Sequence, residues 1–215
     1  MCGIVGFVNF EKDITNSKNI LINMNNTLSK RGPDEEGYYI NNHVALAHKR
    51  LIVIDPEGGK QPMSASSNQS VSIDKPKTNM LINYNSNFII SYNGQIYNTN
   101  ELRKTLEEND FTFDTHSDTE VLLKSYIFYG NDVVKHLNGI FSFAIWNSSK
   151  EELFVARDHF GVKPFFYTII DNSFIFASEI KALFEYPGVE KILDSQGISE
   201  LFGIGPAHTP RYNYI

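Results

Sequence analysis

The stretch MCGIVGFVNF, residues 1–10, opens the chain and decides how its fold begins. Residues 4–10 form an apolar, β-branched run of strand length. A helix should follow, because the next apolar residues recur at helical spacing before Gly32-Pro33 ends the pattern. These residues are Ile20, Leu21, Met24 and Leu28. The chain therefore opens as a strand followed by a helix, with Cys2 directly before the strand.

Further strands are expected over residues 37–40 and 44–54, joined by the turn Asn41-Asn42. Residues 56–87 are rich in Ser, Asn, Gly, Pro and Lys, with a weak apolar patch near residues 80–84. Such a composition predicts a long surface excursion with a hairpin at its tip.

Residues 88–92 read as a short buried strand that runs directly into Asn93-Gly94, a dipeptide typical of tight turns. Two helices are expected next, over residues 99–109 and 118–129. Four strand-like segments then follow in succession, which predicts an antiparallel meander. These segments are residues 140–146, 153–157, 165–169 and 174–177.

Short helices over residues 178–184 and 196–202 close the pattern, and residues 203–210 resemble a linker. Strands in two groups, with helices between and after them, favour an α+β layered domain over alternating βαβ units. We assign residues 1–203 to this one domain.

Bulk composition limits the function classes. The chain has 215 residues, 41% of them hydrophobic and 20% charged, which suits a packed globular domain. Its formal charge is −6 and no Lys/Arg-rich run stands out, so we expect neither nucleic acid nor a membrane surface as partner. No apolar stretch reaches the length of a membrane span, and we expect a cytoplasmic protein.

The chain holds a single cysteine, which excludes an intrachain disulfide and a zinc site built from several thiolates. A lone cysteine is more often a buried apolar residue than a catalyst. Position 2 changes this balance, because removal of Met1 would give Cys2 a free α-amine. An α-amine has a pKa of about 7.7–8.0, so it can accept the thiol proton near neutral pH.

Three other segments could serve a site, each with a structural alternative. A turn at Asn93-Gly94 would present an amide side chain and a bare N–H, as an oxyanion hole does, or be a plain turn. Asp118 could bind an ammonium group or only complement the helix dipole, while Ser117 and Glu120 match a capping box. Arg50, in an apolar strand, needs an anion or must reach the surface.

Two Arg/Asp segments read mainly as architectural ion pairs. They are Arg31-Gly32-Pro33-Asp34 and Ala156-Arg157-Asp158-His159-Phe160-Gly161.

These strings together resemble the glutaminase domain of asparagine synthetases, a class II glutamine amidotransferase of the N-terminal-nucleophile type. The resemblance covers nearly the whole chain, with motifs in the same order and spacing. It rests on residues 1–6, 31–34, 47–55, 92–98, 117–121, 137–146, 156–164 and 176–183.

The resemblance implies a four-layer αββα sandwich of two antiparallel sheets flanked by helices. It implies that Cys2 attacks glutamine while Asn93 and Gly94 hold the oxyanion. It further implies that Arg50 binds the substrate carboxylate and Asp118 its ammonium group. Val53 and Gln95 are also expected to bind substrate. No metal or other cofactor is implied for this domain.

One residue departs from the family pattern: Gln95 stands where a glutamate usually follows the oxyanion glycine. The lost negative charge predicts weaker glutamine binding with the chemistry retained.

Family synthetases continue into an ATP-dependent domain with an Ser-Gly-Gly-x-Asp-Ser loop, and no such string occurs here. We therefore expect residues 204–215 to begin a linker to a synthetase domain, in cis or in trans, which would use ATP and magnesium to make asparagine from aspartate. Another ammonia acceptor, as in antibiotic or aminosugar pathways, and a silent glutamine-binding domain remain alternatives. A homodimer is also an open alternative.

Overall fold

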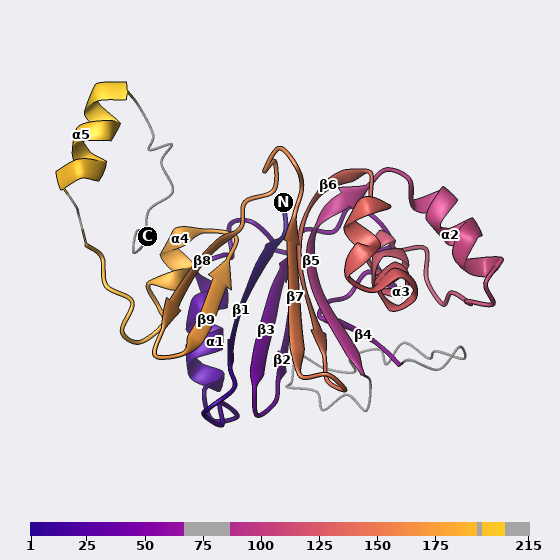
Figure 1. Cartoon of the computed structure of the whole chain (residues 1–215), viewed down its shortest axis with the longest axis horizontal. Coiled ribbons are helices and arrows are strands. Elements are labelled where there is room, and N and C mark those ends of the chain that lie inside the picture. Colours follow the sequence, from indigo (N-terminus) through magenta and orange to yellow (C-terminus); the bar gives the residue numbers. More distant parts are fainter. Residues whose placement is uncertain (67–86, 193–194, 205–215) are drawn as a thin grey trace.

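A computed structural model describes residues 1–66, 87–192 and 195–204 of the chain. Figure 1 shows two sheets side by side, with helices on their outer sides. The elements, in chain order, are β1 (Gly3–Asn9), α1 (Lys18–Asn26), β2 (Glu35–Ile40), β3 (Val44–Arg50), β4 (Met63–Ala65), β5 (Phe88–Ile96), α2 (Thr99–Glu107), α3 (Asp118–Tyr129), the 3-10 helix η1 (Gly130–Lys135), β6 (Gly139–Asn147), β7 (Glu152–Arg157), β8 (Phe166–Ile170), β9 (Ser173–Ala177), α4 (Ile180–Leu183) and α5 (Ser195–Ile204).

The strands form one sheet of order β2-β3-β1-β9-β8 and a second of order β4-β5-β6-β7. Every paired neighbour is antiparallel. β1 lies at the centre of the first sheet, so Cys2 immediately precedes a strand that is paired on both sides.

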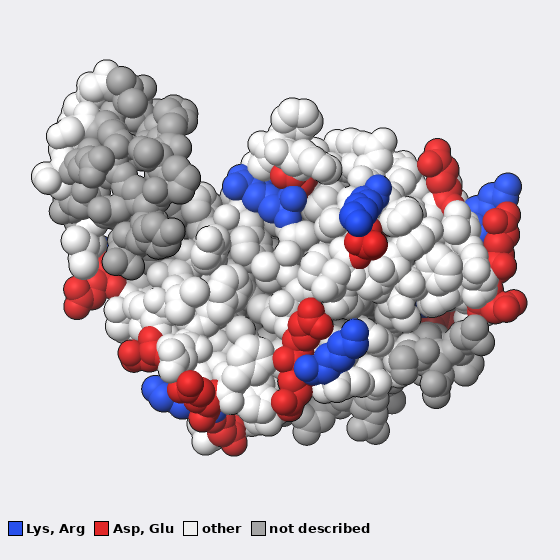
Figure 2. All heavy atoms as spheres, in the orientation of Figure 1, with Lys and Arg blue, Asp and Glu red and all other residues white. Residues whose placement is uncertain are grey.

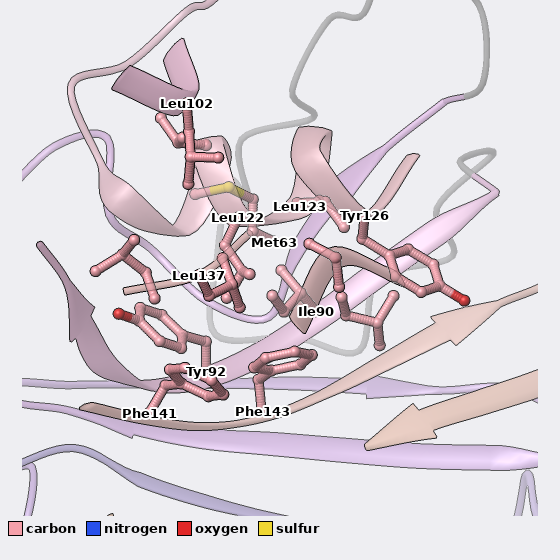
Figure 3. Close-up of a cluster of buried hydrophobic side chains, with 14 of the residues drawn as sticks. Met63, Ile90, Tyr92, Leu102, Leu122, Leu123, Tyr126, Leu137, Phe141 and Phe143 are labelled. Atoms are coloured by element: carbon pink, nitrogen blue, oxygen red, sulfur yellow. The ribbon is translucent and has the colours of Figure 1, made fainter. Parts of the chain in front are cut away.

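Three hydrophobic clusters bind the layers together. The first sheet packs against α1 and α4, and the second packs against α2 and α3. Figure 3 shows the second of these interfaces, where Leu122 and Leu123 meet Tyr92 and Phe143. A third cluster lies between the sheets and includes Trp146. The predicted α+β sandwich with four layers, αββα, is confirmed.

β1 shows why an uninterrupted apolar strand belongs in such a sandwich. Alternate side chains of a strand point to opposite faces. Val5 and Phe7 join the helix-side cluster, whereas Ile4 and Val8 join the cluster between the sheets. Both faces of the strand are covered, so alternation with polar residues is neither needed nor present.

Two local expectations were wrong. The first failed because pairing between neighbouring strands overrides local sequence preference. Asn93-Gly94 forms no turn and instead continues β5, paired with Ser142 and Phe141. The strand expected over residues 44–54 ends at Arg50, and residues 51–54 leave the sheet.

Two further expectations, one about strand order and one about a surface excursion, also failed. The predicted meander is split, because β6 and β7 belong to one sheet and β8 and β9 to the other. The excursion expected over residues 56–87 contains the short strand β4. Its expected hairpin tip lies outside the described residues, as do residues 205–215 of the expected linker.

Candidate active site

A pocket at the start of β1 and the end of β3 gathers every residue that the sequence and the resemblance singled out for a substrate site. The predicted residues that line it are Cys2, Arg50, Val53, Asn93, Gly94, Gln95 and Asp118. They come from β1, β3, β5, α3 and the segment after β3, which the fold brings to one place. These residues thus line one pocket, while the role of each stays a prediction.

The Cys2 thiol lies against the chain that leaves β3. Its Sγ accepts the Leu51 N–H at 3.4 Å and lies 3.6 Å from the Leu51 carbonyl. Burial raises the pKa of the Cys2 thiol, while the Leu51 N–H, the N-terminal ammonium, Arg50 and Lys163 act in the lowering direction. Leu51 directly follows the last residue of β3, so the end of this strand lies beside the sulfur.

Met1 also lines the pocket, and its ammonium group donates to the Arg31 carbonyl at 3.3 Å. Arg31 Nε in turn donates to the Cys2 carbonyl at 2.8 Å. With Met1 in place, the Cys2 nitrogen is part of a peptide bond and is not a base. Removal of Met1 would create the free amine beside the thiol and open this side of the pocket.

Asn93 brings a buried donor that the protein leaves unused. The residue is 2% exposed, and its Nδ2 has no hydrogen-bond partner among the described residues. Buried polar groups in folded proteins are nearly always paired, so an unpaired amide facing a pocket points to a ligand atom.

The backbone N–H of Gly94 is not used in pairing with the neighbouring strand β6. Gly94 pairs with Phe141 of β6. The Phe141 N–H and carbonyl are both bonded to Asp158, at 3.2 and 2.8 Å. In an antiparallel pair, a residue whose polar groups point to one neighbour has none left for the other. The Gly94 N–H therefore points away from β6.

The neighbours of Gly94 along β5 show where that N–H points. Tyr92 and Ile96 lie two positions away on either side, so their N–H groups share its direction. The Tyr92 N–H donates to Gln61 Oε1 at 2.6 Å, and the Ile96 N–H donates to Asp118 Oδ2 at 3.3 Å. Between these two bonds, Gly94 presents its N–H to the pocket.

Glycine is required at position 94. A Cβ there would lie 2.5 Å from the Ile140 carbonyl and 2.5 Å from the Tyr92 ring. Any side chain would push the strand away from β6 and displace the N–H that faces the pocket.

Asp118 begins α3 and is held by a phenol. Its Oδ2 accepts the Tyr92 hydroxyl at 2.8 Å, and it forms no ion pair within the described part of the chain. Burial raises the pKa of Asp118, although these hydrogen bonds oppose the rise. A half-buried carboxylate without a cation is suited to receive an ammonium group from a ligand.

Arg50 satisfies its need for an anion inside the protein. Nη1 pairs with Glu35 Oε2 at 2.6 Å and donates to the Pro56 carbonyl, and Nη2 donates to the Asp55 carbonyl at 2.7 Å. The side chain is 5% exposed, so the alternative of a surface arginine is wrong. Binding of a substrate carboxylate by Arg50 stays a prediction.

Val53 and Gln95 form the outer rim of the pocket. Both side chains are exposed, Val53 by 77%. Their expected contact with substrate also stays a prediction.

Sequence reasoning missed several lining residues, of which Gln61 and Lys163 matter most. Gln61 receives the Tyr92 N–H and donates from Nε2 to Thr119 Oγ1 at 3.2 Å, which ties β5 to α3. It falls within the expected surface excursion and carries no local signal. Lys163 lies two residues beyond the end of the Arg157-Asp158 motif, inside the segment 156–164 that contributed to the resemblance, and no role was expected for it.

The architectural motifs bond differently than expected. Arg31 pairs with Glu179 at 3.3 Å, and Asp158 accepts backbone N–H groups. The capping box is half formed: Ser117 caps α3, but buried Glu120 pairs with Lys124 at 2.6 Å and accepts the N–H groups of Asp114 and Thr115 instead of the Ser117 N–H.

Two features are absent from the part of the chain that the structure describes. No group of three or more His, Cys, Asp or Glu side chains there could hold a metal ion. None of the helices described is both long and apolar enough to span a membrane. On the face in Figure 2, basic side chains lie in small groups beside acidic ones.

Known proteins resemble this chain in sequence. It is 46% identical over 210 residues to asparagine synthetase (glutamine-hydrolyzing) 3 of Bacillus subtilis (strain 168), over 98% of this chain and 32% of that protein. It is 30% identical to asparagine synthetase B (glutamine-hydrolyzing) of Escherichia coli (strain K12), over 85% of this chain and 30% of that protein. The chain thus spans about a third of the length of these relatives.

Solved structures share the fold. A glutamine phosphoribosylpyrophosphate amidotransferase from B. subtilis, complexed with ADP and GMP, matches with a TM-score of 0.65 and 20% identity, over 85% of this chain and 43% of that one. At this identity the likeness concerns the fold alone. The family model described as "Glutamine amidotransferase domain" matches residues 1–215. With its sandwich fold and its cysteine pocket, the chain belongs to the glutamine amidotransferase domain family.

Proposed function

We propose that the pocket hydrolyses L-glutamine to glutamate and ammonia, with Cys2 as the nucleophile. One observation carries this proposal. The chain's only thiol lines the same pocket as two hydrogen-bond donors, Asn93 Nδ2 and the Gly94 N–H. Two such donors are what an acyl-transfer site needs to stabilise a tetrahedral oxyanion.

The reaction begins after removal of Met1. The free α-amine of Cys2 takes the thiol proton, and the sulfur lone pair bonds to the side-chain carbonyl carbon of glutamine. The π electrons of that carbonyl move to its oxygen, where the Asn93 and Gly94 donors receive the charge.

The resulting ammonium group then returns its proton to the substrate nitrogen, the carbon–nitrogen bond breaks, and ammonia leaves. A γ-glutamyl thioester remains on Cys2. Water attacks this thioester with the α-amine as base, the carbon–sulfur bond breaks, and glutamate departs as the thiol regains a proton. In this proposal, neither ammonia release nor thioester hydrolysis needs a metal or other cofactor in this domain.

Substrate orientation is proposed to come from opposite charges at the two ends of the amino-acid group. Asp118 would receive the α-ammonium, and Arg50 the α-carboxylate, with Val53 and Gln95 at the rim. Because Arg50 already bonds Glu35, carboxylate binding would share or replace part of that pairing.

The ammonia acceptor is proposed from the relatives, which are named asparagine synthetases and are about three times as long. We propose that a synthetase domain, in cis or in trans, uses ATP and magnesium to convert aspartate to asparagine with this ammonia. A cytoplasmic location suits that role. A different acceptor would leave the chemistry at Cys2 unchanged.

Release of glutamate and ammonia from glutamine tests the proposal. We expect Cys2→Ala to abolish release and Asn93→Ala to lower kcat by about 100- to 1,000-fold, the usual effect of losing one oxyanion donor. Asn100→Ala, on the exposed side of α2, is the matched control and should leave kcat unchanged. Activity that survives in Cys2→Ala would overturn the proposal.

A further inference from the structure

Lys163 is a half-buried lysine on the pocket wall that the proposed mechanism leaves unused. Its ammonium group makes no ion pair with any residue in the described ranges 1–66, 87–192 and 195–204. We propose that Lys163 is a positioning residue that holds an unpaired positive charge beside Cys2 and thereby favours the thiolate and the oxyanion that follows it.

The loop that carries Lys163 is built to hold the residue in place. Asp158 Oδ2 accepts the Lys163 N–H at 2.9 Å, and Asp158 Oδ1 accepts the Val162 N–H at 2.9 Å. From the other side, Arg157 Nε donates to the Lys163 carbonyl at 2.7 Å, and its Nη2 donates to the Gly161 carbonyl at 2.5 Å. Four hydrogen bonds thus fix the backbone at and just before Lys163.

The same carboxylate connects this loop to the oxyanion strand. Asp158 Oδ2 also accepts the Phe141 N–H at 3.2 Å, and Phe141 pairs with Gly94. Through Phe141 and Asp158 the backbone of Lys163 is tied to the strand that carries Gly94, and Lys163 lines the same pocket as Cys2 and Gly94.

Other charged groups around the thiol are compensated or will change. Arg50 is paired with Glu35 at 2.6 Å, which reduces the field that its charge exerts on the sulfur. The ammonium on Met1 departs with that residue, and the α-amine that Cys2 then carries must be neutral to act as the base. Asp118, from α3, adds a negative charge to the same pocket and would oppose a thiolate until substrate pairs with it.

Lys163 is therefore the fixed cation of this pocket that no described carboxylate neutralises. Burial raises the pKa of the Cys2 thiol, and Lys163 is one of the groups that act against this rise. A neighbouring lysine is a known means of lowering a cysteine pKa. Burial raises the pKa of Tyr92 well above its ordinary value, so this phenol stays uncharged and adds no negative charge to the pocket.

The inference extends the proposed function, but its test does not need glutamine. Cys2 is the only cysteine, so the rate of alkylation by iodoacetamide reports this thiol alone. The rate is measured against pH on the chain from which Met1 has been removed, with intact mass confirming both the N-terminus and the single adduct.

We expect Lys163→Met, which keeps the aliphatic stem, to shift the alkylation profile to higher pH and to slow alkylation at pH 7 by about 2- to 10-fold, since one pKa unit is a factor of ten. Lys163→Gln should do the same, and Lys163→Arg should restore the wild-type profile. Lys150→Gln, at the exposed β6–β7 turn, removes an equal charge far from the pocket and should have no effect.

Thermal unfolding of each variant identifies one that fails to fold, and the other charge-removing variant then carries the test. Superimposable alkylation profiles of wild type and the folded variants would overturn the role of Lys163. A Lys163-dependent profile in a wild-type chain that releases no glutamate would instead overturn the proposed function and leave this inference standing.

Discussion

At the residue scale, the pocket keeps several groups in states that cost the empty protein stability. Among the described residues, Asn93 Nδ2 is buried without a partner and Asp118 is a half-buried carboxylate without a cation. Such features are tolerated where a ligand later satisfies them. Substitutions that relieve the cost should therefore stabilise the fold and weaken the function.

Asp118→Asn is expected to separate these two effects. Asparagine loses the charge that would pair with an α-ammonium, a hydrogen bond to a charged group worth about 1.5–3 kcal/mol. We expect kcat/KM for glutamine to fall by about 10- to 100-fold, mainly through KM. Steady-state glutaminase kinetics measure this, and an unchanged KM would contradict the role of Asp118.

The stability of the same variant depends on pH with a definite sign. Because the folded-state pKa of Asp118 is raised above the unfolded value, its carboxylate destabilises the fold once pH exceeds the unfolded pKa of about 3.9. We expect Asp118→Asn to have a higher Tm than wild type at pH 7 and a similar Tm near pH 3. A lower Tm at pH 7 would contradict this account.

Gln95→Glu tests the departure from the family pattern. Gln95 lies at the exposed rim of the pocket that also holds Asp118. A carboxylate there would restore negative charge near the substrate ammonium, and exposed charge pairs contribute up to about 1 kcal/mol. We expect KM for glutamine to fall by about 2- to 5-fold with kcat nearly unchanged. An equal or higher KM would sink this explanation.

At the scale of elements, β3 and β5 are tied to each other across the two sheets. His48 Nε2 donates to the Tyr92 carbonyl at 3.0 Å, and Ser91 Oγ donates to the Ala47 carbonyl at 3.1 Å. In a neutral imidazole the first bond requires the tautomer that carries its proton on Nε2. These bonds hold the strand of Asn93 against the sheet that carries Cys2.

Acid should destabilise the fold at His48, because burial makes the charged imidazole costly. Burial lowers the pKa of His48 to about 3, compared with about 6.5 in the unfolded chain. The folded state therefore binds this proton less tightly, and the stability it contributes above pH 6.5 is lost as pH falls toward 3.

Chemical denaturation at several pH values between 6.5 and 3 measures the effect. We expect His48→Gln to flatten the decline in unfolding free energy by up to about 1.4 kcal/mol per pH unit, the limit for one proton. His159→Gln, at an exposed histidine, is the control and should keep the wild-type slope. Equal slopes in wild type and His48→Gln would refute the assignment.

Sequence predicts elements well where local pattern and packing agree. β1 is apolar along its length and is buried on both faces. Asn93-Gly94 misled because β6 fixes Gly94 in a strand, although the dipeptide prefers a turn. The site was found from motifs at Cys2, Arg50 and Asp118, whereas Lys163 reaches the pocket only through a loop geometry that no local pattern reveals.

At the scale of the whole molecule, the two sheets bring distant segments to one pocket. Cys2 and Lys163 are separated by most of the chain, yet both line it. A four-layer sandwich explains how this occurs. The antiparallel neighbours β1 and β3 begin and end, respectively, at the same end of the first sheet, and both contact β5 of the second sheet.

The central claim is that Cys2 acts as nucleophile with its own α-amine as base, and glutamate release by two forms of the chain tests it most directly. One form begins at Cys2 and the other retains Met1, and intact mass verifies each. We predict that only the form beginning at Cys2 releases glutamate at an appreciable rate. Equal rates from both forms would contradict the claim.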